Sequence, residues 1–121
     1  MKLAEAPVFE TPNAVMRVYA GRAATGSALA MWRAEMGSGA SGPLHTASTE
    51  QVLVVLEGRL RAVVDGEEQL LEPGDSLTLP AGVERQLSAL AEHGVVTLTA
   101  AEPGATARVG DSAATPIPWA G

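Results

Sequence analysis

The chain has 121 residues, a formal net charge of −6 and no cysteine. Its length fits one domain with a buried core, and the lack of cysteine excludes disulfide scaffolds, thiolate metal sites, iron–sulfur clusters and cysteine nucleophiles. Fourteen acidic residues stand against eight basic ones, with no basic cluster, so a nucleic-acid partner is not expected.

Apolar and polar residues alternate with period two through most of the chain, and short turn signals interrupt the pattern, which predicts eight strands. They are Val15–Tyr19, Ala28–Met36, Glu50–Leu56, Arg59–Val64, Gln69–Leu71, Ser76–Leu79, Arg85–Leu90 and Val95–Ala100. Asp65-Gly66 is the strongest turn signal, because this pair readily adopts the positive φ angles of a tight hairpin. Strands spaced about ten residues apart predict an all-β sandwich or barrel without long helices.

The chain ends in a segment of different character. We expect residues 1–105 to form the barrel and residues 106–121 to form an extended C-terminal arm, in which Thr115–Trp119 is rich in proline. Trp119 is free in this prediction to dock on a neighbouring subunit or on its own barrel, or to remain in a loosely held tail. Trp32 is expected in the core rather than in a pocket.

Two stretches have a specific spacing of turn residues and polar residues. The first, Gly39–Gly58, carries His45, Ala47 and Gln51 at fixed intervals between its two glycines. The second runs from Gly74 to Ala89 and contains Pro80, Gly82 and Arg85. Together they resemble the two motifs of the cupin family, G-x5-H-x-H-x3-E-x6-G and G-x5-P-x-G-x2-H-x3-N. The resemblance implies a small bacterial cupin, folded as a double-stranded β-helix or jelly-roll barrel of two antiparallel sheets.

The glycines and the proline match the family motifs, whereas most of the metal-binding positions do not. In the family, two His and a Glu of the first motif and a His of the second hold one metal. Here His45 keeps the first position, but Ala47, Gln51 and Arg85 occupy the other three. An amide is a weak substitute for a carboxylate and a guanidinium cannot act as a ligand. We therefore expect no bound metal and no other cofactor.

Strand parity places Arg85 on the inward face of its strand, as the only polar group there. A guanidinium remains charged and is costly to desolvate unless acceptors or an anion surround it. Three answers are open. Glu35 could pair with it, a ligand's carboxylate, enolate or phenolate could do so, or Arg85 could lie at the barrel mouth and reach into water.

His45, Gln51 and Arg85 are the candidate ligand-binding residues. His45 is either a hydrogen-bonded wall residue or a general acid or base, and in the second case Arg85 would be its catalytic partner by stabilising an oxyanion, with Gln51 orienting the substrate. The alternative metal site is a divalent transition metal held by His45, Gln51 and Glu50, although Glu50 has the wrong parity and would need a bulge to point inward. His93 is expected at an exposed loop tip.

The strand after His45 is apolar on both faces, since Val52, Val54 and Leu56 alternate with the inward residues. A strand that is apolar on both sides is usually buried on both sides. The cover is either a second subunit, as the resemblance to cupins implies, or the chain's own N-terminal segment. We predict a homodimer.

Three functions follow from these expectations. The first is the binding of a small anionic or enolisable organic molecule inside the barrel, without a functional metal. The second is a metal-independent isomerase, cyclase or dehydratase that uses His45 and Arg85. The third is a metal-dependent dioxygenase with a reduced ligand set.

The cellular setting is predicted from what the sequence lacks. No stretch approaches the eighteen or so apolar residues that span a bilayer, and Glu5 interrupts the region where a signal peptide would be apolar. We expect a cytoplasmic protein without a membrane partner. Abundant alanine, with Lys2 as the only lysine, suggests a GC-rich bacterial genome.

Overall fold

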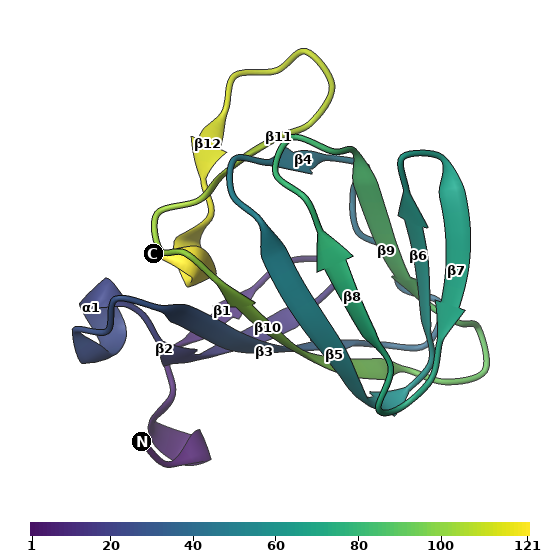
Figure 1. Ribbon diagram of the computed structural model, residues 1–121. Helices are drawn as coiled ribbons and strands as arrows, with labels where there is room; N and C mark the ends of the chain where they lie inside the picture. The colour runs from purple at the N-terminus through teal and green to yellow at the C-terminus, as the bar shows by residue number, and fades with distance from the viewer.

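The computed structural model describes all 121 residues, and almost every regular element in it is a strand (Figure 1). The strands are β1 (Val8–Glu10), β2 (Val15–Ala20), β3 (Ala30–Met36), β4 (Thr46–Ala47), β5 (Gln51–Gly58), β6 (Leu60–Val64), β7 (Glu67–Leu71), β8 (Ser76–Leu79), β9 (Arg85–Ala89), β10 (Val95–Ala101), β11 (Thr106–Arg108) and β12 (Thr115–Pro116). The helical elements are η1 (Leu3–Glu5), α1 (Arg22–Thr25) and η2 (Pro118–Ala120). None of these helices is long enough to cross a membrane.

All eight predicted strands are present, with ends that differ by at most two residues from those expected. The four additional strands, β1, β4, β11 and β12, contain only two or three residues each. Segments this short show no alternation of apolar and polar residues, so periodicity cannot reveal them. The all-β jelly-roll class expected from the sequence is confirmed.

The strands form one large sheet and a second layer that is divided. The large sheet has the order β1-β2-β3-β10-β5-β8. The other strands form two three-stranded sheets, β7-β6-β9 and β12-β11-β4, where we expected a single second sheet. Two isolated bridges, Ser41 with Ser88 and His45 with Arg85, connect the chain before β4 to β9. The segment between them contains Pro43, which has no N–H to donate, so the ladder is interrupted there.

Strand parity places the side chains of β5 alternately on its inward and outward faces, as expected, and within this chain only the inward face is covered. Leu53 and Val55 are each 1% exposed, while Val52 and Leu56 on the opposite face are each 43% exposed. The inward residues join Leu60, Leu77 and Leu79 in the first of two core clusters. The N-terminal segment does not cover the outward face of β5, so that alternative for its burial is wrong.

The turns follow the local chemistry of the sequence. Asp65 and Gly66 both have positive φ angles, 51° and 79°, and connect β6 to β7 as a two-residue hairpin. This is the turn that Asp-Gly predicts. Gly58, the last glycine of the first motif, has a φ of 76°, and a Cβ atom there would lie 1.8 Å from the carbonyl oxygen of Gly94. Only glycine fits at that crossing of two chain segments.

Residues 106–121 pack against the barrel of their own chain. Thr106–Arg108 pairs with β4 and with β12, while Ile117 and Ala120, which are 7% and 0% exposed, lie in the second core cluster with Met16, Ala30 and Trp32. Figure 1 shows this C-terminal segment, in yellow, above one end of the large sheet. The segment therefore closes the barrel end instead of projecting from it as an extended arm.

Candidate ligand-binding site

The barrel contains a half-open cavity of about 460 Å³, within the usual size range of small-molecule sites. Its deep wall is apolar and includes Met36, Leu53, Leu60 and Leu87. Its outer part is formed by Thr11–Ala14 and by the C-terminal segment Thr115–Trp119. No Asp, Glu, Lys or Arg lines it, so His45 is the only ionisable side chain in the wall.

His45 lies where the chain enters the second layer, just before β4. Its Nδ1 is 2.9 Å from the carbonyl oxygen of Pro43. A carbonyl only accepts hydrogen bonds, so Nδ1 must carry the proton. Burial is the main cause that lowers the pKa of His45 from 6.5; the positive charge of Arg85 lowers it further, and the bond to Pro43 opposes both. The imidazole is therefore neutral near pH 7, and its Nε2 atom has a free lone pair.

Three further polar side chains line the cavity and are nearly inaccessible from outside. They are Gln51 at the start of β5, 8% exposed, and Thr97 and Thr99 of β10, 6% and 5% exposed. None of the three side chains makes a hydrogen bond with another protein group. Sequence reasoning identified Gln51 but missed both threonines. The only signal for them was strand parity, which places Thr97 and Thr99 on the face opposite Val96 and Leu98.

Arg85 is placed differently from the two other predicted ligand-binding residues. It is 0% exposed, and its side chain is not part of the cavity wall. Its Nε donates to the carbonyl oxygen of Val83 at 2.8 Å, and one terminal nitrogen, Nη2, donates to that of Pro80 at 2.6 Å. The other, Nη1, has no partner. Burial lowers the pKa of Arg85, but the group remains charged at ordinary pH.

Two of the expected answers to the charge of Arg85 are wrong. Glu35 forms an ion pair with Arg33, and both residues alternate with Ala34 and Met36, which line the cavity, so Glu35 faces away from the barrel interior. Arg85 does not reach into water either, since it is fully buried. Two backbone carbonyls of the Pro80–Val83 turn accept its hydrogen bonds instead, a solution that strand parity alone cannot predict.

The residues present do not form a metal site of the kind that the family motif implies. Ala47 is a buried core residue without a donor atom, and Arg85 is a cation. Glu50 is exposed and lies outside the cavity wall, so it does not complete the alternative set with His45 and Gln51. Nowhere in the chain do three His, Cys, Asp or Glu side chains gather closely enough to hold a metal. The cavity offers one imidazole nitrogen and only neutral amide and hydroxyl oxygens beside it, with no carboxylate and no second imidazole, a donor set that suits a transition metal poorly.

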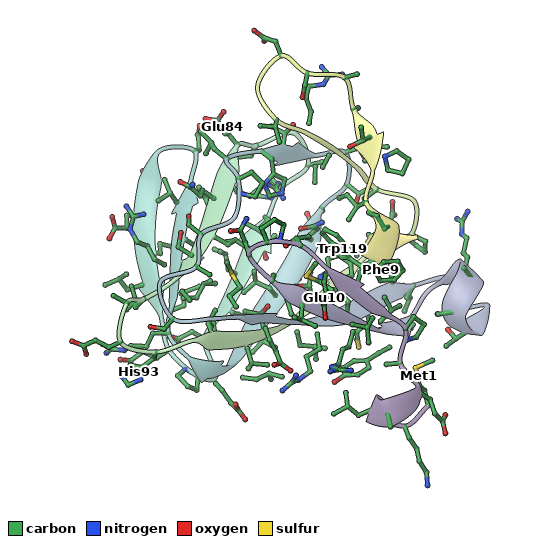
Figure 2. All side chains as sticks on the ribbon, turned by 180° about the vertical axis from the view of Figure 1, so that it is seen from behind. Met1, Phe9, Glu10, Glu84, His93 and Trp119 are labelled. Carbon is green, nitrogen blue, oxygen red and sulfur yellow. The ribbon has the colours of Figure 1, made fainter.

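The remaining singled-out residues lie in the core or at the periphery. His93 is exposed in the loop before β10, as expected, and Figure 2 shows it at the outer edge of the molecule, far from Trp119. Trp32, 5% exposed, belongs to the second core cluster and also lines the cavity. The predicted core position of Trp32 is confirmed. Core and pocket were alternatives in the sequence-based prediction, but Trp32 occupies both.

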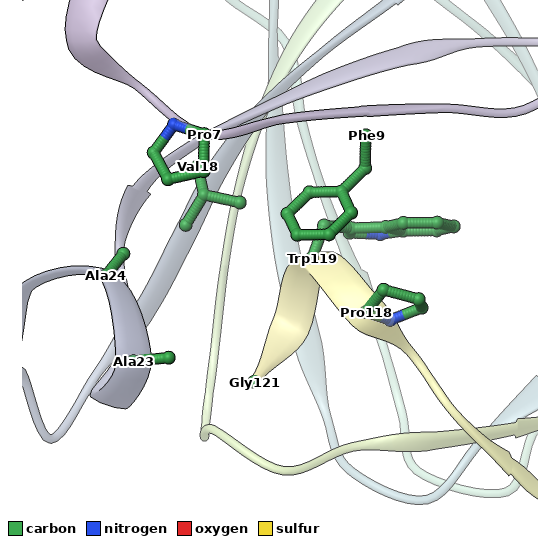
Figure 3. A pocket seen from close by; sticks show the side chains of 8 residues that line it. All are labelled: Pro7, Phe9, Val18, Ala23, Ala24, Pro118, Trp119 and Gly121. Atoms are coloured by element: carbon green, nitrogen blue, oxygen red, sulfur yellow. The ribbon is translucent and has the colours of Figure 1, made fainter.

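Trp119 separates the cavity from a small surface pocket. That pocket, of about 180 Å³, lies between α1, β1, β2 and η2, and Trp119 and Pro118 line both spaces. Figure 3 shows the Phe9 ring beside the Trp119 indole at this point. The docking of Trp119 on its own barrel, one of the alternatives left open by the sequence, is the arrangement observed.

Comparisons with known proteins agree with this architecture. The family model for the cupin domain matches residues 32–100. This range includes both motif stretches, Gly39–Gly58 and Gly74–Ala89, and most of the cavity-lining strands β3, β5 and β10. A search of curated protein sequences gave no match.

Several solved structures share the fold at low sequence identity. A sugar phosphate isomerase from a cupin superfamily, from Silicibacter pomeroyi, has a TM-score of 0.73 and 22% identity over 93% of this chain and 82% of its own. The polyketide cyclase RemF from Streptomyces resistomycificus has a TM-score of 0.74 and 16% identity over 84% of this chain and 77% of its own. A salicylate 1,2-dioxygenase mutant from Pseudoaminobacter salicylatoxidans, in complex with gentisate, has a TM-score of 0.69 and 22% identity over 79% of this chain and 27% of its own. These likenesses support the fold and not an activity.

Proposed function

The chain belongs to the cupin family, and from this premise we propose that its cavity binds a small organic molecule without a metal ion. The observation that carries the proposal is the donor set. Within a cavity of about 460 Å³, His45 Nε2 and the Gln51 amide are available to a ligand, but the other positions of the family's metal site hold Ala47 and Arg85. Such a wall recognises an organic molecule more readily than it retains an ion.

The first expectation for the ligand, that it is anionic, rested on Arg85 pointing into the cavity. Because Arg85 donates to Pro80 and Val83 instead, nothing in the cavity wall supports an anion. The second expectation, that the ligand is enolisable, keeps its support from the basic Nε2 of His45.

The test combines metal analysis with extraction of bound small molecules. We expect protein purified without chelator to contain far less than one transition metal per chain, and an organic compound to be released on denaturation and detected by mass spectrometry. The same extraction is repeated on the variant Ala34→Leu. This change enlarges a side chain that lines the cavity, so the variant should release less of the compound than the unmodified protein. A stoichiometric metal that is lost in His45→Ala would contradict the proposal.

A second candidate function is metal-independent catalysis of an isomerisation, cyclisation or dehydration. The specific observation that favours it is the state of His45, whose neutral imidazole has its Nε2 lone pair available beside a space walled largely by apolar side chains. In an isomerisation Nε2 accepts a proton from the carbon next to a substrate carbonyl and returns it to another atom of the same molecule, and in a dehydration it delivers that proton to the departing hydroxyl group as the C–O bond breaks, so that water leaves; neither reaction needs a co-reactant. Arg85, the catalytic partner expected from the sequence, does not reach the cavity; Gln51 is the neutral donor that remains for the enolate oxygen.

The two candidates differ in what His45 does. In an enzyme, His45→Ala lowers kcat by about a hundredfold or more with a smaller effect on binding, since general acid–base catalysis contributes about that much. In a binding protein, the same variant changes affinity alone.

We also propose that two copies of the chain pair through the outward face of the large sheet. Val52 and Leu56 of β5 are exposed there, and Val54 together with Val96 and Leu98 of β10 are partly exposed beside them. A continuous apolar face of this kind is usually covered in solution. A second copy is the occupant we propose, because a two-fold axis covers the same apolar face on both chains at once, and the one charged pair that borders the face, Arg33 with Glu35, is already neutralised within each chain.

A further inference from the structure

No Asp, Glu, Lys or Arg lines the cavity, and three of its polar side chains lie on adjacent strands of the large sheet; the others, Thr11, Asn13, His45 and Thr115, come from other segments. Thr97 and Thr99 are on β10, and Gln51 is on the adjacent strand β5, where its backbone pairs with Ala101. The opposite wall contains Leu60 of β6 and Leu87 of β9. Leu53, which pairs directly with Thr99 across the two strands, also lines the cavity, so the three polar side chains form a strip within a wall that is otherwise apolar.

The three side chains of this strip are more than nine-tenths buried, and none has a protein partner. Buried polar side chains nearly always have a hydrogen-bond partner. Only two buried side-chain atoms in the whole chain are both sealed from solvent and without a partner, Thr49 Oγ1 and Arg85 Nη1. The polar atoms of Gln51, Thr97 and Thr99 are therefore reachable, and the space that reaches them is the cavity.

The spacing of these three side chains determines where a ligand in the cavity would find hydrogen-bond partners. Residues two apart on one strand face the same side and lie about 7 Å apart, so the hydroxyls of Thr97 and Thr99 present two separate hydrogen-bonding points along the cavity wall. Gln51 is diagonal to Thr99 across the strand pair, a relationship within reach of a long side chain. A threonine hydroxyl and a glutamine amide each donate and accept, so they recognise hydroxyl and carbonyl oxygens equally well.

We propose that Gln51, Thr97 and Thr99 form a recognition strip that selects an uncharged ligand, with hydroxyl or carbonyl oxygens along one edge of a compact hydrocarbon frame. This inference rests on the proposed function, since it names the ligand class of the same cavity. A carboxylate or phosphate is disfavoured, because it would leave water for a wall that has no cation. The hydrocarbon frame packs against Leu60 and Leu87.

Three probes with one ring frame test the proposal: naphthalene, a naphthalenediol and a hydroxynaphthoate. Calorimetry or ligand-observed NMR measures each affinity for the intact chain. We expect the diol to bind about tenfold more tightly than naphthalene, as two neutral hydrogen bonds predict, and the carboxylate to bind most weakly. In Thr97→Val/Thr99→Val, which keeps the side-chain shape, the diol should lose its advantage while naphthalene binds as before. The control Thr106→Val alters a threonine outside the cavity wall and should preserve the order.

The outcomes separate the two claims. If no probe binds to the unmodified chain, the proposed function fails along with the inference. If naphthalene binds but the diol has no advantage, or if the double valine variant keeps that advantage, the cavity is a binding site and the recognition strip is refuted. Tightest binding of the hydroxynaphthoate overturns the selection of uncharged ligands and indicates that the charge of Arg85 acts within the cavity.

Discussion

His45 and Arg85 face each other across an isolated β-bridge, in which each backbone N–H donates to the other's carbonyl oxygen at 2.9 Å. Their side chains nevertheless lie in different environments. His45 lines the cavity, whereas Arg85 turns to the carbonyl oxygens of Pro80 and Val83. Of two positions that hold a metal in the family motifs, one is thus available to a ligand and the other supports a turn.

Replacing Arg85 tests this structural role. Arg85→Met removes the donors to Pro80 and Val83 and leaves two carbonyls in a buried turn without partners. We expect the free energy of unfolding to fall by at least about 2 kcal/mol in chemical denaturation, because the two hydrogen bonds from a charged donor, each worth about 2 kcal/mol, outweigh the relief of no longer burying the guanidinium. The matched control is Arg61→Met, which removes an exposed ion pair with Glu68 and should change stability little. A more stable Arg85→Met protein would show that the guanidinium is an uncompensated charge awaiting an anion.

The lowered pKa of His45 predicts a pH dependence of stability. Because the folded-state pKa lies below the unfolded value of 6.5, the unfolded chain binds a proton in the interval between the two values and the folded chain does not. The free energy of unfolding should therefore fall as the pH drops through that interval, and His45→Gln should remove this part of the dependence. Denaturation at a series of pH values measures it, and an NMR titration of the single imidazole in His93→Gln measures the pKa directly. A pKa above 6.5 would contradict the burial of His45.

How far the sequence predicts the site depends on the kind of feature. Alternation identified the long strands and the inward positions of His45, Gln51 and Arg85, because parity follows directly from an extended backbone. It could not show where the end of the Arg85 side chain goes, since that depends on the turn at Pro80–Val83. Thr97 and Thr99 went unnoticed because threonine is common in strands. Their role emerges only when the cavity beside them is seen.

The glycine at the end of the first motif should be far less tolerant of substitution than a glycine in an open turn. Gly58→Ala forces a Cβ atom onto the Gly94 carbonyl in addition to a positive φ, and we expect a loss of at least about 3 kcal/mol in the free energy of unfolding. Gly66 has nearly the same φ, 79°, but a Cβ atom added there would meet nothing within 4 Å. Gly66→Ala should therefore cost only about 1 kcal/mol. Equal losses in thermal or chemical denaturation would mean that backbone conformation alone makes glycine necessary at position 58.

Charged residues on the outward face of β5 should prevent the proposed pairing of two chains. We expect the unmodified protein to have about twice its chain mass of 12.4 kDa in size-exclusion chromatography with light scattering, and Val52→Lys/Leu56→Lys to have the mass of one chain. The control is Leu70→Lys on β7, because Leu70 is also exposed, at 59%, but belongs to a different sheet. A monomeric unmodified chain, or a Leu70→Lys variant that dissociates equally, would count against this interface.

The C-terminal segment should contribute to stability as a part of the barrel. Ile117 is 7% exposed and packs in the second core cluster, so Ile117→Ala should lower the free energy of unfolding by about 2 to 4 kcal/mol. Val109→Ala removes a similar apolar group from a position that is 51% exposed, and should cost less than about 0.5 kcal/mol. Because Trp119 lies two residues beyond Ile117 and lines the cavity, loosening this anchor should also increase acrylamide quenching of tryptophan fluorescence. If the C-terminal segment does not contribute to the core, Ile117→Ala should have the same free energy of unfolding and the same acrylamide quenching as the unmodified protein.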